Sequence, residues 1–297
     1  MTIVNAPAGA FAEWLALPPG FRFPDVPLRI DRQRQRRNHL ITGVDDDLFG
    51  DRVNAGVLTD VISQSVHAVK LPIDGRVLLG LQVQQRTALS IGQDLIGRGR
   101  IDALVSAPRG HLLTCSYHLI AADQPASAPP PVSIRNTMLL LDPSTPRAAP
   151  GARPVEDPLA GFTRSGRCTM TPEAVRAYCA EIGNLIHFDE EYARARGYRA
   201  PIAPRLLDVT ILVAELRRAH GDRSAPFAFD LDLRVHRPLF WDETLDTWIR
   251  RAGDSFEFRL VTGDGRITSA ATATLGTEPR STRSGPANPA DESEFRA

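Results

Sequence analysis

The sequence predicts an α+β protein made of two copies of one unit, in which a buried helix is followed by an antiparallel meander. Three observations predict it. Apolar residues recur at helical spacing over residues 56–70 and again over 206–216, and β-prone runs separated by turn signals follow each helix. The same order of elements occurs twice along the chain. A helix followed by strands joined through short turns is an α+β arrangement.

The first predicted unit contains one helix and three strands. Its helix is expected over residues 56–70, because apolar side chains recur there at three- and four-residue spacing until Pro72 breaks the pattern. Strands are expected, in chain order, over residues 77–85, 94–103 and 112–121. His67 falls on the predicted helix, where an apolar face suggests a core histidine rather than a ligand.

Residues 124–158 are rich in proline and alanine, which favours an extended linker over helix or central sheet. Residues 138–141 are the exception and could form a strand or a plug. The sequence therefore divides into a first unit over residues 1–123, this linker, a second unit over 159–276, and a polar tail over 277–297 that is expected to be disordered.

The second unit repeats the order of the first. Thr171 and Pro172 mark a helix start, with the threonine as N-cap and the proline in the first turn. An apolar helix is expected over residues 206–216. Strands are then expected, in chain order, over residues 227–236, 244–252, 255–262 and 267–275. The glycine-rich turn over residues 262–266 predicts a hairpin between the last two.

The two units can be superposed on the sequence. Residues 53–62 lie over residues 202–211 at an offset of 149, and residues 86–89 lie near 237–240 at an offset of 151. Identity is weak, but the order of elements agrees over more than a hundred residues. Pairing the units would bury both long helices and join the sheets edge to edge, which also removes exposed strand edges.

Composition excludes several classes of protein. The 297 residues contain 35 Lys plus Arg and 35 Asp plus Glu, so no global field draws in nucleic acid or an anionic membrane. Three scattered cysteines without a CxxC pair argue against a disulfide framework or a zinc site and suit a reducing cytoplasm. No signal peptide is evident, and no apolar run reaches the roughly 18 residues of a transmembrane helix. We expect a cytoplasmic protein without a metal.

A dense motif lies between the two predicted helices of the second unit. Residues 182–207 read IGNLIHFDEEYARARGYRAPIAPRLL, with a histidine ahead of a short charged segment, a Gly-Tyr break and a proline-flanked helix entry. This stretch resembles the signature of the MaoC-like, or (R)-specific enoyl-CoA hydratase, family. The positions that match that family's pattern are Asn184, His187, Asp189, Tyr192, Ala193, Gly197 and Tyr198. Asp189 is also placed to cap the short helix that follows it.

The resemblance implies a double hotdog fold and chemistry on acyl thioesters. It implies a hydratase or dehydratase that interconverts a 2-enoyl and a 3-hydroxyacyl thioester carried on coenzyme A or an acyl carrier protein. Fatty acid or polyketide metabolism would be the setting. No cofactor is implied beyond the coenzyme A or phosphopantetheine of the substrate itself, and no nucleic acid or membrane partner. A homodimer is left open.

The same resemblance assigns residues to roles. His187 is the acid/base, which suits an imidazole that exchanges protons near pH 7. The family's carboxylate falls on Ile182 without gaps, or on Asn184 if the loop is two residues shorter, and an amide can orient water but cannot take a proton. Backbone amides near Arg205 and Leu206, at the positive end of the apolar helix, would hold the thioester oxygen.

Further residues are placed around this site. The Arg205 side chain stands where the family has glycine, and it could grasp a substrate carboxylate or phosphate. Tyr198 and Arg237 complete the expected substrate-binding set, although Arg237 equally suits a charge on the sheet rim. No histidine is recognised before Gly56 at the family spacing, so the first unit is expected to be a degenerate copy that shapes the acyl tunnel.

Two other functions and one charged segment stay open. The chain could be a catalytically inactive double hotdog that binds acyl thioesters or supports an active partner. It could also be a thioesterase, for which Asp60 is the obvious carboxylate on the first-unit helix. The basic run over residues 29–37 is expected to be a solvated edge, or else a contact for the phosphates of coenzyme A or a carrier arm.

Overall fold

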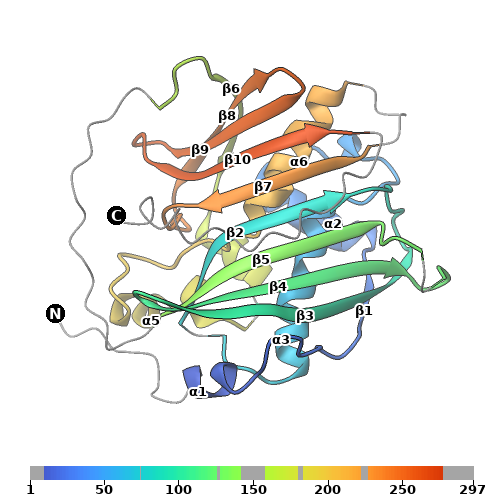
Figure 1. The fold of residues 1–297 in the computed structure, drawn as a ribbon. Coiled ribbons are helices and arrows are strands. Elements are labelled where there is room, and N and C mark those ends of the chain that lie inside the picture. Colours follow the sequence, from blue (N-terminus) through green and yellow to red (C-terminus); the bar gives the residue numbers. More distant parts are fainter. Residues whose placement is uncertain are drawn as a thin grey trace.

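A computed structural model describes residues 10–73, 75–125, 128–141, 158–179, 183–221 and 227–276. Its described strands form one antiparallel sheet in the order β1-β3-β4-β5-β2-β7-β10-β9-β8-β6. Helices α2 (Arg32–Thr42), α3 (Val61–Ala68) and α6 (Leu207–His220) lie against one face of this sheet (Figure 1). This is the predicted α+β architecture.

The sheet consists of two five-stranded halves with the same internal order. The N-terminal unit contributes β1 (Val26–Arg29), β2 (Arg76–Gln85), β3 (Asp94–Ala107), β4 (Gly110–Ala121) and β5 (Val132–Leu141). The C-terminal unit contributes β6 (Thr163–Thr169), β7 (Phe229–Val235), β8 (Thr244–Ala252), β9 (Ser255–Thr262) and β10 (Ile267–Leu275). Reading inwards from either end gives the same succession of equivalent strands, so the predicted repeat of one unit is confirmed.

Strands β2 and β7 join the two units edge to edge, as predicted. Leu81 lies opposite Leu233 in an antiparallel register. Gln82 and Gln84 of β2 donate hydrogen bonds to Asp232 and Asp230 of β7, at 3.0 and 2.6 Å. Both inner edges are therefore paired, and the apolar cluster beneath the sheet runs through both units.

The linker prediction is wrong for part of its length. Residues 132–141 form strand β5, which pairs with β2 on one side and β4 on the other, so the N-terminal unit extends to Leu141 rather than ending at residue 123. Alternating buried positions such as Val132, Ile134 and Met138 give this strand its place in the sheet. Linker residues 126–127 and 142–157, and the predicted tail, lie outside the described residues.

The central helix of each unit is confirmed, with one difference in the first. The segment expected over residues 56–70 starts as a 3₁₀ helix, η2 (Ala55–Asp60), and continues as α3. Asn54 caps it, because its side-chain oxygen accepts the amide of Gly56 at 2.9 Å. Helix α6 has 14 residues, against 8 in α3, and is buried along most of its length.

The two central helices cross at Gly56. A Cβ atom added there would lie 2.4 Å from both the Cα and the amide nitrogen of Thr210, which is closer than real Cβ contacts. Asn54 strengthens the same crossing by donating from Nδ2 to the Thr210 carbonyl at 3.1 Å. A glycine is needed at residue 56 because backbone, not a flexible side chain, occupies the space.

Replacing Gly56 by alanine is expected to destabilise the fold by about 1–3 kcal/mol or more, since the helices must move apart to admit the methyl group. Gly263→Ala is the matched control, because nothing lies within 4 Å of the Cβ it would introduce. Urea denaturation of both variants measures the difference. Equal midpoints for the two variants would show that the crossing relaxes without cost.

Candidate active site

The site begins where helix α4 (Pro172–Cys179) leads into a short 3₁₀ helix, η3 (Leu185–His187). Thr171 caps α4 as predicted, with its hydroxyl accepting the Ala174 amide at 3.3 Å. Asn184 caps η3, with its side-chain oxygen accepting the amide of Ile186 at 3.4 Å. Ile182, a candidate for the family carboxylate position, lies outside the described residues.

The hydrogen bonds of His187 fix which ring nitrogen carries the proton. Nδ1 lies 2.7 Å from the carbonyl oxygen of Ile202, and a carbonyl can only accept, so Nδ1 is the donor. In the neutral ring Nε2 is then the acceptor, 3.4 Å from Nδ2 of Asn184. Since Asn184 turns its oxygen towards Ile186, its amino group faces the imidazole. The structure thus brings together the two predicted catalytic residues.

The imidazole stays neutral over a wide pH range. Desolvation by the surrounding protein lowers the pKa of His187 from 6.5 to about 4, and the hydrogen bond to Ile202 offsets this only in part. The side chain is still partly exposed. At pH 7 the ring therefore presents a lone pair on Nε2 rather than a positive charge.

This pKa links the stability of the fold to pH. Because the folded-state pKa lies below that of the unfolded chain, the unfolded state binds the proton more readily. The stability conferred by the neutral ring is complete above about pH 6.5 and declines as the pH falls towards about 4. We expect the unfolding free energy of wild type, relative to His187→Gln, to decrease across that window. Urea titrations at pH 7.0, 5.5 and 4.5 measure it, and a constant difference would contradict the low pKa.

The segment after His187 forms α5 (Glu190–Ala195). Asp189 caps it, accepting the Tyr192 amide at 2.9 Å, as the sequence predicts. Gly197 ends it with a φ of 80°, a conformation that favours glycine. Tyr198 then lies half-buried, with its amide bonded to the Ala193 carbonyl at 3.1 Å. A role for Tyr198 in substrate binding stays a prediction.

The hydrogen bonds at the start of α6 limit which backbone amides could donate to the thioester oxygen. The amides of Leu207, Asp208 and Val209 donate to the carbonyls of the three residues over 204–206, at 3.1–3.2 Å. The expected contact with the thioester oxygen is therefore confined to the preceding amides, those of Arg205 and Leu206. Both lie at the positive end of a 14-residue helix.

The Arg205 side chain turns into the protein instead of towards a substrate carboxylate or phosphate. It is 8% exposed, and its Nη2 donates to Asp208 Oδ2 at 2.5 Å and to Ser269 Oγ at 2.6 Å. Ser269 in turn donates to the same Asp208 oxygen at 2.7 Å. Burial lowers the pKa of Arg205 and raises that of Asp208, while their mutual attraction opposes both shifts. The expectation that this side chain grasps a ligand is replaced by an internal ion pair at the start of α6, which Ser269 connects to β10 through hydrogen bonds.

Arg237 lies exposed just after the end of β7, and its amide bonds the Thr268 carbonyl at 3.2 Å. This place matches the rim charge that the sequence analysis left open, and a ligand contact stays a prediction. His67 is exposed too, so its interpretation as a core histidine is wrong. The helix α3 turns that residue outward while Val66 beside it is buried.

The first unit has an apolar side chain where the second has His187. Its short helix η1 (Asp46–Leu48) is capped by Asp45, as η3 is capped by Asn184. Leu48 is therefore the residue equivalent to His187, at an offset of 139. The bridges Arg52–Ser90 and Ile202–Phe240 then match at an offset of 150. The 11 additional residues of the second unit contain α5.

A buried polar chain in the first unit was missed by the sequence analysis. His39 is fully buried, with Nδ1 2.7 Å from Asp46 Oδ1 and Nε2 3.4 Å from Asn54 Nδ2. Desolvation lowers the pKa of His39, which the Asp46 contact opposes. The signal was its place in the sequence repeat, because at the offset of 149 His39 falls on Phe188, one position from His187. With no exposed surface, this imidazole braces the helix crossing rather than meeting a substrate.

No metal centre or membrane-spanning element is apparent in the described residues. No group of three or more His, Cys, Asp or Glu side chains there could hold a metal ion. None of the helices among them is long and apolar enough to cross a membrane. All three cysteines are free and buried, and Cys168 donates from Sγ to the Ile41 carbonyl.

No protein-family model and no curated protein matches the sequence. Solved structures do match the fold. HtdX from Mycobacterium tuberculosis has a TM-score of 0.67 and 18% identity, covering 84% of this chain and 98% of its own. A MaoC-like dehydratase from Phytophthora capsici has 0.59 and 12%, covering 88% and 97%. An acyl-ACP thioesterase from Bacteroides thetaiotaomicron has 0.53 and 9%, covering 86% and 98%.

These matches establish the class of architecture. The chain is a double hotdog, with two helix-wrapped sheets fused into one, and a further matched protein from Mycobacterium tuberculosis is described by that fold name. MaoC-like dehydratases are prominent among its structural neighbours. At identities of 18% and below, the likeness defines the fold, and activity has to be argued from the site.

Proposed function

We propose that the protein is a hydratase or dehydratase that interconverts a 2-enoyl thioester and a 3-hydroxyacyl thioester. The observation that carries this proposal is the neutral His187, whose Nδ1 proton is fixed on the Ile202 carbonyl so that Nε2 is the basic atom beside the Asn184 amide. An imidazole held in one tautomer next to an amide donor can move a proton and orient the oxygen that shares it.

Hydration requires two proton transfers at His187. Nε2 of His187 takes a proton from water while the water oxygen bonds to C3 of the enoyl group, and the π electrons move onto C2 and the thioester oxygen. The protonated Nε2 then gives its proton to C2, which restores the thioester carbonyl. Asn184 orients the water through its amino group. Amides near Arg205 and Leu206 stabilise the negative thioester oxygen.

The low pKa of His187 favours one half of this cycle. A ring with a pKa of about 4 is a strong acid once protonated and a weak base when neutral. Protonation of C2, or of a leaving hydroxyl in the reverse direction, is therefore easy. Substrate binding that brings negative charge near the ring would raise the pKa towards neutrality.

The thioesterase alternative finds less support. Its candidate carboxylate, Asp60, accepts hydrogen bonds on both oxygens, from Arg34 Nη2 at 2.9 Å and from the Tyr178 hydroxyl at 3.0 Å. A carboxylate held in this way is a poor nucleophile or base. The likeness to an acyl-ACP thioesterase concerns the fold only.

One assay separates the three functions. Crotonyl-CoA and longer enoyl-CoA esters are followed by the enoyl absorbance, with a thiol reagent in parallel, for wild type and for His187→Ala. Loss of the double bond that depends on His187 supports the hydratase. Absorbance loss matched by release of free thiol would identify a thioesterase, because hydrolysis also ends the conjugation of the double bond with the thioester. No turnover of any chain length, with retained binding, would identify an inactive acyl-thioester binder.

A further inference from the structure

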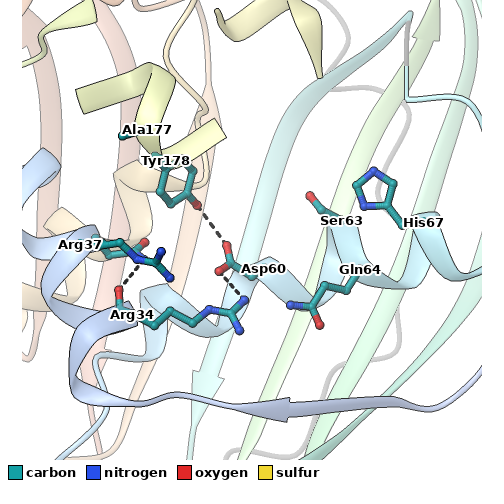
Figure 2. A pocket seen from close by; sticks show the side chains of 9 residues that line it. Arg34, Arg37, Asp60, Ser63, Gln64, His67, Ala177 and Tyr178 are labelled. Atoms are coloured by element: carbon teal, nitrogen blue, oxygen red, sulfur yellow. Dashed lines mark hydrogen bonds and ion pairs between the residues drawn. The ribbon is translucent and has the colours of Figure 1, made fainter. Parts of the chain in front are cut away.

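A polar pocket outside the candidate active site opens between α2, α3 and α4 (Figure 2). Its volume is about 70 Å³, and eight of its nine lining residues carry a polar group. Helices α2 and α3 belong to the N-terminal unit and α4 to the C-terminal unit. The pocket therefore lies where the two units meet, and neither Asn184 nor His187 lines it.

A hydrogen-bonded network occupies one side of the pocket. Figure 2 shows Asp60 between the Arg34 guanidinium and the Tyr178 hydroxyl. The Arg34 and Asp60 side chains are only 19% and 15% exposed, so this ion pair is better shielded than a surface pair. Because Arg34 compensates the charge of Asp60, the carboxylate does not make the pocket acidic.

The other lining residues favour an anion. Arg37 of α2 lies exposed near Arg34 on one side of Asp60, and His67 of α3 lies exposed on the other side, on the same helix as Ser63 and Gln64 (Figure 2). Among the described lining residues there are two guanidinium groups and one carboxylate. Arginine presents donors in a fixed fork that matches phosphate oxygens, and serine and glutamine add neutral donors.

The size of the pocket is sufficient for a small polar group. One ordered water needs roughly 10–15 Å³ of such space, so about 70 Å³ has room for several water-sized groups. A tetrahedral oxyanion fits this space.

We propose that this pocket binds a phosphate group through Arg37 and the neighbouring α3 side chains, with Arg34 held in its ion pair with Asp60 at the pocket wall. Naming its source rests on the proposed function: a thioester on coenzyme A or on a phosphopantetheine arm carries such a phosphate some distance from the reacting bond. Tyr178 precedes Asn184 by six residues, so the pocket wall and the candidate dyad are separated by at most about 20 Å of chain. Free phosphate has the same chemistry and is the other source.

Binding of inorganic phosphate, 4′-phosphopantetheine and coenzyme A to the full chain, measured by titration calorimetry at low salt, tests the proposal. Arg37→Glu is expected to weaken binding by about tenfold or more, since it replaces a charge-assisted contact by repulsion. His67→Ala should weaken it less. Arg36→Glu is the matched control, because it makes the same charge change one position along α2 on a residue that pairs with Asp46 at 3.5 Å and does not line the pocket.

The outcomes separate this inference from the proposed function. His187→Ala should bind all three probes as wild type does, whether or not the protein has hydratase activity. Competition between inorganic phosphate and coenzyme A identifies the substrate arm as the source, and phosphate binding without competition identifies free phosphate. The proposal is overturned if no probe binds, or if Arg37→Glu and Arg36→Glu bind equally well while both keep the wild-type thermal midpoint.

Discussion

Replacing His187 by alanine is expected to lower hydratase turnover by about 10²–10⁴-fold, the range that a positioned acid/base contributes. The loss should appear in kcat, because the role of Nε2 is to transfer protons during the reaction rather than to bind the acyl chain. The enoyl absorbance assay measures it. Retained binding of coenzyme A by the variant would show that the fold survives.

Variants at Asn184 test the partner of the imidazole. Asn184→Ala removes both the η3 cap and the amide beside Nε2, whereas Asn184→Asp keeps a capping oxygen and adds a carboxylate. We expect the alanine variant to lose activity and the aspartate variant to keep or exceed that of wild type, with its rate optimum shifted to higher pH because the carboxylate raises the imidazole pKa. Equal activity of wild type and His187→Ala would remove the imidazole from the mechanism.

The largest effect on stability is expected at the buried ion pair of Arg205 and Asp208. Replacing Arg205 by methionine leaves the Asp208 carboxylate buried at 1% exposure without its cation. Removing one partner of such a pair costs about 3–5 kcal/mol, which is a large share of the stability of an ordinary domain. Chemical denaturation of the variant measures the loss.

A double substitution tests the physical reason for that loss. Arg205→Met combined with Asp208→Leu removes both charges and replaces them with apolar groups of similar length, so the double variant should recover much of the stability that the single variant loses. In the single variant the Ser269 hydroxyl can still donate to Asp208. In the double variant this acceptor is absent. If both variants are equally unstable, the cost lies in packing rather than in an uncompensated charge.

Periodicity predicted most of the fold. The strands β8, β9 and β10 occupy the predicted residues, and the two central helices and the seam between the units were also predicted. Strand β5 was largely missed because prolines at residues 129–131 and 143–150 surround it and suggest a linker. The η2 segment follows helical spacing but is wound as 3₁₀, a difference that apolar periodicity cannot report.

The candidate site was only half accessible to sequence reasoning. The His187 and Asn184 pair could be predicted because both lie in one short segment. The inward turn of Arg205 could not, since it depends on Ser269, 64 residues away, and on the space beneath α6. The same is true of Asp60, whose partners Arg34 and Tyr178 come from different units.

The β2–β7 seam also governs how separate molecules can meet. Among the described strands, β1 and β6 are the two edge strands of the sheet. Both are poorly suited to pair with a strand from another molecule. β1 has four residues and contains Pro27, which lacks an amide proton, while the ladder of β6 is interrupted between Arg164 and Gly166. Addition of further strands at either edge of the sheet is therefore disfavoured. Self-association would have to use side-chain surfaces instead of main-chain pairing.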